Sequence, residues 1–479
     1  MKVLFGVCIL GFSMQGVCHS SEASSSASAA SAASAASASS AQTISLQDCE
    51  RMARENHASV KIAGEQVQLQ KSKQWEALRA LYPTASLKAE STIGKDVKSL
   101  GVPGFTEKNY GGQVSQSIFQ GGKLFRTYQQ SKANVQLYNA RYQKALQEVI
   151  FNVRESYWNW VKARRVANVY AKTLTDLKQE DDRAETLFVK DMITRQVYMT
   201  VDTQYQHAQQ NLNASEAEVE AKLWQWAAAL GLSNLPAFIP SLETETAATI
   251  DLKLSDCLEI AQKNHPELLE QQYALEAARL GDKIAKSAYW PQIDVNGFYG
   301  RSGSAFDNEN FSWSEDWQLG ARASIYFGGN NVGFSGSKQK TSPKLGQSSR
   351  TESETVGVNV GILDALKSRT DRIEARVVYD QAKYQSEKTK IDVLNRVRQS
   401  FADFKKAQAQ LNITSADLNL AKIEFSVTTI KVGRREAVFS ERALARSKVT
   451  QAEVAWEEAR ASYHIALSTL HYALGIVKY

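Results

Sequence analysis

The segment that decides the fold occurs twice in the chain. Residues 46–57 read LQDCERMARENH and residues 254–265 read LSDCLEIAQKNH, with six of the twelve positions identical at an offset of 208. Further along, the offset is 244, because VRES at 153–156 pairs with VRQS at 397–400. Self-similarity over this length indicates two copies of one structural unit.

The matches define the limits of the two copies. Both copies end in Ala-Leu-Gly, at 229–231 and at 473–475. We therefore predict repeat 1 at 44–232, a linker at 233–251 and repeat 2 at 252–476. The change of offset means that repeat 2 carries 36 additional residues, which fall between 300 and 364.

The residues before repeat 1 read as export and tether sequences. Lys2 and the apolar run that follows it predict a signal peptide at 1–20. The Ser/Ala-rich stretch 21–43 has too little apolar bulk to pack, so it predicts a flexible tether. Cys18 is a candidate for lipidation, although Val17 stands where a lipidation signal has a small residue.

Composition argues against nucleic-acid binding and catalysis. The net charge of +6 is spread over 57 basic and 51 acidic residues, so we expect no nucleic-acid partner. Phosphate-loop, nucleophile-elbow and zinc-helix motifs are absent, so we expect no enzyme, no metal and no cofactor. His57 and His265 match between the repeats and could bind a metal, but we favour their role as helix-boundary residues. Cys49 and Cys257 also match and could form a disulfide, but we favour their role as small packing residues.

Each repeat alternates between two periodicities. Period-two alternation of apolar and polar residues predicts strands at about 83–91, 110–120, 290–300, 316–327 and 355–363. Either of the last two could lead into the helix that follows. The distance from the last strand to the end of the repeat is the same in both copies if 355–363 is that strand. Gly122 lies 110 residues before Leu232, and Leu366 lies 110 residues before Ile476, which favours 355–363. The stretch 317–352 would then be an added element at an extracellular rim.

Long helices follow the strands. Residues 123–230 contain neither Gly nor Pro, and long helices are predicted at 122–232 and 365–476. A helix of about 70 residues is about 100 Å long, which suits a tube across the periplasm better than a globular core. Trp158, Trp160, Trp224 and Trp226 lie on these helices and are predicted packing residues.

The strands require partners from other chains. After the signal peptide no apolar run reaches the roughly 18 residues of a membrane-spanning helix, so a membrane location requires strands closed into a barrel. Four or five strands from one chain do not close a barrel, and we therefore expect an oligomer. Tyr110, Tyr299, Trp313 and Trp317 are candidates for an interfacial aromatic girdle. A soluble coiled-coil protein would leave these strands unexplained.

Several motifs carry a resemblance to a known family. Repeat 2 opens with Leu254, Ala261 and the run NHPEL at 264–268, the return strand of repeat 1 ends in FQGG at 119–122, and both copies end in Ala-Leu-Gly. In this order the chain resembles the TolC family of outer-membrane efflux proteins. The resemblance implies a mainly α protein with transmembrane β-strands, in which a homotrimer forms a 12-stranded barrel continuous with a periplasmic helical barrel.

The resemblance also implies a function. It predicts a passive exit duct for efflux or secretion in the outer membrane, in contact with outer-membrane lipids and extending into the periplasm. A periplasmic adaptor protein would couple the duct to an inner-membrane transporter. The alternative is a structural envelope protein that has the same helical-barrel architecture without transport.

The family places its closable, adaptor-facing mouth at the turns between the long helices. In repeat 2 this turn has Arg435 at the family's arginine, and Gly433 permits a left-handed or otherwise tight turn; in repeat 1, Asp191 replaces the glycine. The candidate residues are Lys190, Asp191, Met192, Thr194, Val432, Gly433, Arg434, Arg435 and Glu436. Arg434 and Arg435 would pair with carboxylates across protomers to close the mouth, or the turns are solvated helix ends.

Overall fold

A computed structural model describes most of the chain from residue 42 onward. The described residues are 42–94, 104–234, 238–242, 253–306, 310–327, 329–343, 349–434 and 436–476. The chain divides into two units, Met1–Gln42 and Thr43–Tyr479, and the architecture below is that of the second. The predicted signal peptide, Cys18 and most of the predicted tether lie outside the described residues.

The order of elements repeats along the chain, as the sequence predicts. Repeat 1 contains α1 (Leu46–Asn56), α2 (Ala58–Arg79), β2 (Thr84–Gly94), β3 (Phe105–Gln120), α3 (Lys123–Val189) and α4 (Arg195–Ala229). Repeat 2 contains α5 (Leu254–Asn264), α6 (Pro266–Ser287), β5 (Gln292–Phe306), β6 (Ser314–Phe327), β7 (Asn330–Thr341), β8 (Thr351–Gly361), α7 (Leu366–Gly433) and α8 (Phe439–Leu474). The short strands β1 (Gln42–Ile44) and β4 (Phe238–Pro240) pair beside the helices.

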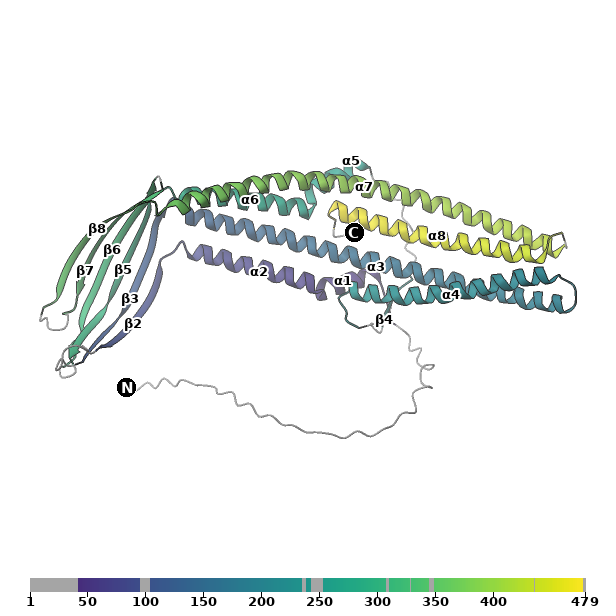
Figure 1. Cartoon of the computed structure of the whole chain (residues 1–479), viewed down its shortest axis with the longest axis horizontal. Helices are drawn as coiled ribbons and strands as arrows, with labels where there is room; N and C mark the ends of the chain where they lie inside the picture. The colour runs from purple at the N-terminus through teal and green to yellow at the C-terminus, as the bar shows by residue number, and fades with distance from the viewer. Residues whose placement is uncertain are drawn as a thin grey trace, which may run out of the picture. The chain divides into compact units, whose positions relative to one another are not determined.

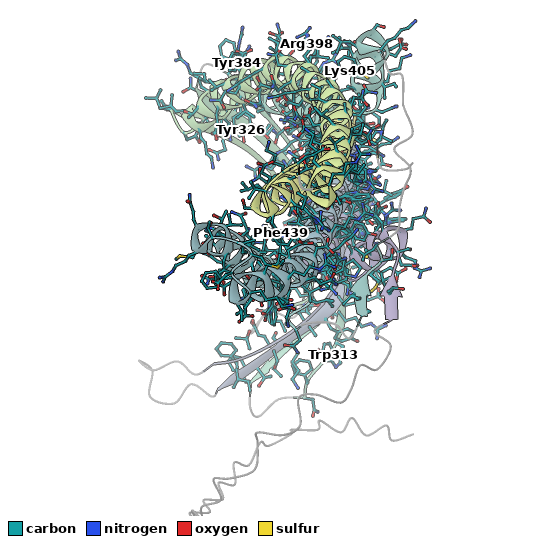
Figure 2. The ribbon with its side chains drawn as sticks, turned by 90° about the vertical axis from the view of Figure 1, so that its right-hand side faces the viewer. Trp313, Tyr326, Tyr384, Arg398, Lys405 and Phe439 are labelled. Carbon is teal, nitrogen blue, oxygen red and sulfur yellow. The ribbon has the colours of Figure 1, made fainter. Side chains whose placement is uncertain are left out.

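The helices form one layer, and α3 and α7 run through its length. Near the sheet, neighbouring helices follow the order α2, α3, α6 and α7; farther away, α4 and α8 replace α2 and α6 (Figure 1). Seen along its length, the layer is curved, with Tyr384, Arg398 and Lys405 on its α7 side (Figure 2). None of the described helices has the length and apolar content needed to cross a membrane.

A six-stranded antiparallel sheet lies at one end of the helices (Figure 1). Its order is β2-β3-β5-β6-β7-β8, and β8 leads into α7. The predicted segment 317–352 is therefore not a rim element, because β6 and β7 pair along their length with β5 and β8. Strand β7 is missed by pattern reading, since its four Gly and Ser residues and two Lys weaken the β signal.

The two repeats build equivalent cores. In repeat 1, Cys49, Val153, Trp160 and Trp226 pack together; in repeat 2, Cys257, Val397, Phe404 and Leu470 occupy the corresponding positions. Cys49 and Cys257 are both fully buried, free thiols in separate clusters, so the disulfide alternative is wrong. Burial raises the pKa of the Cys49 thiol to about 12.

The paired histidines are helix caps. The Nδ1 atom of His57 accepts a hydrogen bond from the Ser59 N–H at 3.3 Å, and His265 Nδ1 accepts one from the Glu267 N–H at 3.2 Å. Each residue thus caps the second helix of its repeat, α2 or α6. His265 is buried, and burial lowers its pKa to about 4; the nearby Arg396 and Lys144 lower it too, against the opposing effect of Glu267.

Acid is therefore expected to destabilise the helical layer. The unfolded chain takes up protons as pH falls below about 6.5, whereas buried His265, His464 and His471, whose pKa values burial lowers to about 4, remain neutral. Stability is thus retained above about pH 6.5 and falls toward pH 4, by up to about 3 kcal/mol for each group. Thermal unfolding measured from pH 7.5 to 4.5 tests this loss.

A matched pair of variants isolates one histidine. His265→Asn keeps a side-chain acceptor at the cap and is expected to reduce the pH dependence of the unfolding temperature. His57→Asn makes the same change at the more exposed cap of repeat 1. An unchanged pH dependence in His265→Asn would show that other groups cause the acid effect.

Candidate functional site

The candidate site of the sequence analysis lies at the end of the helices opposite the sheet (Figure 1). The α3–α4 turn spans 190–194 and the α7–α8 turn spans 434–438; we call them the tip turns. Both helices end in the same way. The Met192 N–H donates to the Leu187 carbonyl at 2.9 Å, and the Glu436 N–H donates to the Lys431 carbonyl at 2.8 Å. This backbone bond satisfies a carbonyl that the helix end leaves free.

Gly433 has a different place from the predicted one. It is the last residue of α7, and a Cβ atom there would meet nothing within 4 Å. The left-handed position of repeat 1 is Asp191, with φ +55°, and the 244-residue offset equates Asp191 with position 435 and Val189 with Gly433. Asp191 therefore does not replace a turn glycine. Asp tolerates left-handed φ better than most residues.

The tip turns present exposed, unpaired charges in one chain. Lys190, Asp191, Arg434 and Glu436 are exposed, and no ion pair joins them among the described residues. Met192 is also exposed, Val432 is half-buried, and the Thr194 hydroxyl caps α4 by accepting from the Val197 N–H at 3.4 Å. Arg435 lies outside the described residues. Its pairing across protomers remains a prediction.

A cluster of ion pairs that sequence reasoning missed lies next to the tip turns, between α3 and α8. Glu180 and Arg442 approach to 3.0 Å, and Asp176 and Arg446 to 2.9 Å. We call these four residues the ion-pair layer. Because α3 belongs to repeat 1 and α8 to repeat 2, the layer joins the two helical hairpins. The spacings 176/180 and 442/446 could have suggested one helix face, but not its partner.

Burial sets the strength of the ion-pair layer. Each pair has one buried side chain: Glu180 is 9% exposed against 25% for Arg442, and Arg446 is 7% exposed against 43% for Asp176. Arg446 also approaches Glu453 at 3.7 Å and donates to the Thr173 hydroxyl at 3.4 Å, and Thr173 is hydrogen-bonded to Thr450 at 2.8 Å. The charges lie beside an apolar cluster that includes Leu177 and Ala443. Ion pairs in such surroundings are screened less by solvent than surface pairs are.

An acidic group beside the layer has a raised pKa. Burial raises the pKa of Asp181, and the carboxylates of Asp202, Asp182 and Glu185 raise it further. One oxygen of Asp181 and the second oxygen of Glu180 are buried without a hydrogen-bond partner among the described residues. Carboxylates are thus concentrated around this part of α3, and the α8 arginines pair with two of them, Glu180 and Asp176.

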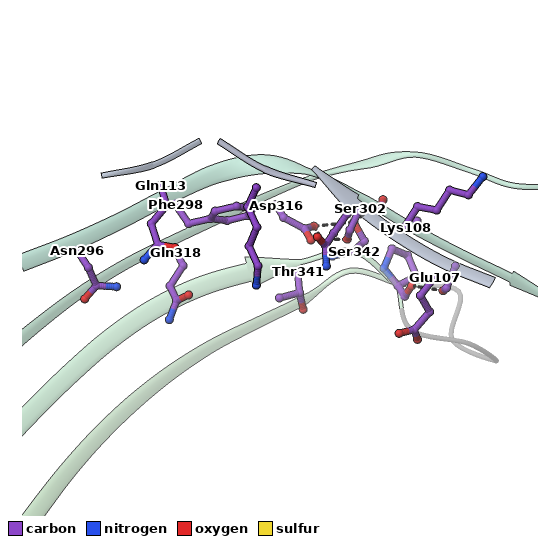
Figure 3. A pocket seen from close by; sticks show the side chains of 15 residues that line it. Glu107, Lys108, Gln113, Asn296, Phe298, Ser302, Asp316, Gln318, Thr341 and Ser342 are labelled. Carbon is purple, nitrogen blue, oxygen red and sulfur yellow. Dashed lines mark hydrogen bonds between the residues drawn. The ribbon is translucent and has the colours of Figure 1, made fainter. Parts of the chain in front are cut away.

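The sheet at the other end has one apolar and one polar face. Leu87, Val114, Leu319, Phe334 and Val358 are exposed on the apolar face. The polar face has a hollow of about 500 Å³, lined by Glu107, Asn296, Gln318 and others (Figure 3). There the Asp316 carboxylate accepts from the Ser342 N–H and hydroxyl, both at 2.6 Å, and from Ser302. Such alternation suits a wall between lipid and water.

The predicted aromatic residues gather on the apolar side. Tyr110 and Trp313 meet edge to face with ring centroids 5.0 Å apart, and Tyr299 lies opposite Trp317 in the β5–β6 ladder. The membrane-interface role of these rings remains a prediction. Their clustering near the loop-connected ends of the strands fits that role.

Comparisons with known proteins place the fold. The profile of the family described as outer membrane efflux protein matches residues 50–232 and 257–476, which are the two repeats. Comparison with curated protein sequences gives no significant match.

Solved structures of outer-membrane channels share the fold at low identity. The Campylobacter jejuni CmeC outer membrane channel is 16% identical with a TM-score of 0.72, over 90% of this chain and 85% of that one. The Vibrio cholerae outer membrane protein VceC is 12% identical, TM-score 0.71, over 90% and 96%. The Neisseria gonorrhoeae MtrE outer membrane channel is 15% identical, TM-score 0.69, over 90% and 89%.

Proposed function

The chain belongs to the outer membrane efflux protein family, and from this premise we propose that it is a passive exit duct for efflux or secretion. The observation that carries the proposal is a two-faced sheet at one end of helices of 67 and 68 residues. Helices of that length extend about 100 Å, enough to join an outer-membrane wall to a partner deep in the periplasm. Transport would be powered by an inner-membrane transporter and coupled through a periplasmic adaptor.

The duct requires a homotrimer. Strands β2 and β8 are the two edges of the sheet in one chain, and each offers unpaired backbone groups to another copy. We propose that β8 of one copy pairs with β2 of the next, so that a barrel closes and its apolar face meets outer-membrane lipids. The polar face, with Asp316, Gln318 and Asn296, would then line the water-filled lumen.

Exposed apolar residues on the helices support the same assembly. One side of α7 carries a stripe in a three-four rhythm, and all its members are exposed in one chain: Ile413, Leu420, Ile423, Val427 and Ile430. At the other edge of the layer, α2 exposes Ile62, Leu69 and Trp75, and α4 exposes Met199 and Trp224. Packing α7 against α2 and α4 of the next copy would bury both sets.

We propose that the helical end is the closable mouth. Within each chain the ion-pair layer would hold the α7–α8 hairpin against α3, and an adaptor that contacts the tip turns would release it. Lys190, Asp191, Met192 and Thr194 in one turn and Arg434, Arg435 and Glu436 in the other are the proposed contacts. A structural envelope protein with the same fold is the alternative, and it would conduct no ions.

Oligomeric state and conductance test the proposal together. We expect the detergent-extracted protein to be a trimer by light scattering, without intermolecular disulfides, and to form channels in planar bilayers. A stable monomer would contradict the closed wall, because the edges of one sheet stay unpaired. A trimer that never conducts, even with Arg442 and Arg446 replaced by serine to release the mouth, would favour the structural alternative.

A further inference from the structure

The 36 additional residues of repeat 2 form a strand pair inside the sheet. In repeat 1, β2 pairs directly with β3; in repeat 2, β5 and β8 are separated by β6 and β7. The sheet therefore contains six strands per chain, and the hairpin β6–β7 has no counterpart in repeat 1. What this hairpin does to the wall follows from its register.

The hairpin leaves the repeat's register unchanged. Thr84 pairs with Ser115 in repeat 1, and the offsets of 208 and 244 equate these residues with Gln292 and Asn359. Gln292 pairs with Ser324, Ser324 with Gly333, and Gly333 with Asn359, so Gln292 and Asn359 lie at the same level across the hairpin. Two strands have been added between β5 and β8 without shifting either one.

The hairpin also keeps the two faces of the sheet. Its apolar-face residues continue the rows of β5 and β8: Ile293 pairs with Ala323, Ala323 with Phe334, and Phe334 with Val358. Its other residues, among them Gln318, Ser324, Ser335, Ser337 and Gln339, fall on the polar face. A one-residue slip would reverse this assignment for a whole strand. The hairpin is therefore built as wall, with a lipid side and a lumen side.

Polar contacts tie the hairpin to the strands on both sides. Asp316 of β6 accepts hydrogen bonds from Ser302 of β5 and from Ser342, which follows β7. On the apolar-face rows near the loops, Glu315 approaches Arg301 of β5 at 3.8 Å and Lys338 approaches Glu352 of β8 at 3.3 Å. These contacts link the hairpin to both neighbours at the end of the sheet farther from the helices.

Six strands match the width of the helical layer better than four. Four helices packed side by side span about 32–40 Å. Strands spaced at about 4.8 Å and tilted by 35–45° give about 35–41 Å for six strands and about 23–27 Å for four. A six-stranded wall segment therefore continues the helical layer without narrowing.

We propose that β6–β7 is a wall hairpin, so that three copies close an eighteen-stranded barrel in place of the twelve-stranded barrel that the resemblance implies. This inference rests on the proposed trimeric duct. Barrel diameter grows about linearly with strand number, so the lumen is about 1.5 times as wide as a twelve-stranded one. The outer-membrane exit then matches the tunnel in width and admits bulkier solutes.

Cysteine pairs in the full-length trimer test the strand order. Val295→Cys with Ala321→Cys joins β5 to β6, and Gly336→Cys with Val356→Cys joins β7 to β8; all four residues lie on the apolar face, and a Cβ atom at Gly336 meets nothing within 4 Å. We expect both disulfides to form. The matched pair Val295→Cys with Val356→Cys is expected to stay reduced, because two strands separate these residues.

The opposite pattern overturns the inference. If the Val295–Val356 pair forms its disulfide, or if neither wall pair does, β5 and β8 are neighbours or the hairpin lies outside the wall. These outcomes do not depend on conduction. A trimer with both wall disulfides and no channel activity would refute the duct and leave the strand order intact.

Excision of the hairpin tests its effect on the pore. Deleting 307–342 removes 36 residues and leaves a loop of ten between the equivalents of Gly94 and Phe105, as in repeat 1. We make this deletion in the variant with Arg442→Ser and Arg446→Ser, in which the mouth is expected to be released. We expect its conductance to fall to about half, in line with the smaller barrel cross-section. A deletion variant that remains trimeric and conducts as well as its parent would place the hairpin outside the wall. If the deletion variant does not assemble, the cysteine pairs decide.

Discussion

Replacing Arg442 and Arg446 with serine is expected to raise the time-averaged conductance of each channel several-fold, because the channel spends more time open. Without the two arginines, Asp176 loses its ion-pair partner on α8 and Glu180 keeps only Arg183 of its own helix, at 3.4 Å. The ionic link between the two hairpins near the tip turns is therefore removed, and the carboxylates of α3 remain. A closed state that loses 1.4 kcal/mol of its advantage gains about tenfold in its open-to-closed ratio. The free energy lost on breaking two partly buried ion pairs is of this order or larger.

The controls separate gating from damage. Arg434→Ser removes an exposed arginine of the α7–α8 turn that forms no ion pair with the described residues, and it is expected to leave basal conductance nearly unchanged. Exchanging the charges, with Glu180→Arg and Arg442→Glu together, keeps the pair and is expected to restore the low conductance of the parent. Trimer retention on heating is expected to be similar in all three, because the sheet is untouched.

The same experiment distinguishes two locations for the lock. The sequence predicts a lock at Arg434 and Arg435, in pairs between protomers, whereas the structure has an ion-pair layer within each protomer. If Arg435→Ser raises conductance and the Arg442→Ser, Arg446→Ser variant does not, the lock lies between protomers at the tip turns. Salt provides a further check, since exposed pairs are screened over about 8–10 Å and the partly buried ion-pair layer responds less.

The order and extent of the elements can be predicted because they depend on local sequence patterns. The repeat fixes the order of elements, and the absence of Gly and Pro from 123–230 predicts the extent of α3 and α4. Period-two alternation locates β2, β3, β5, β6 and β8, with strand ends that differ from the predicted ones by up to six residues. Each signal depends on residues close in sequence, which is where periodicity is informative.

Features that depend on contacts between distant segments were not predicted. Strand β7 has Val332 and Phe334 as its large apolar residues and is held by β6 and β8 on either side. Arg442 and Arg446 look like ordinary surface residues of α8 until α3 is placed beside them. The bend of the α3–α4 turn falls at Asp191, because the backbone pattern of the helix end, and not the position of the nearest glycine, decides which residue takes positive φ.

Trp226→Ala is expected to cost about 3–5 kcal/mol of stability, the largest effect of any single substitution proposed for the helical layer. Trp226 is fully buried, packs among Cys49, Val153 and Leu230, and meets Phe238 edge to face with centroids 5.9 Å apart. Truncation opens a cavity where α1, α3 and α4 converge. Hydrogen exchange of these helices and the unfolding temperature of the trimer measure the loss.

The other copy of the repeat and the neighbouring tryptophan provide the controls. The 244-residue offset places Leu470, also fully buried, at the position of Trp226, so Trp226→Leu keeps a side chain that this core position accepts and is expected to cost less than alanine. Trp224 lies two residues away and is 47% exposed in one chain. Trp224→Ala is therefore expected to leave hydrogen exchange in the core unchanged and to act, if at all, on trimer retention, since its face of α4 is the one we assign to the next copy. Equal loss of core protection in both alanine variants would contradict this division between protomer core and protomer interface.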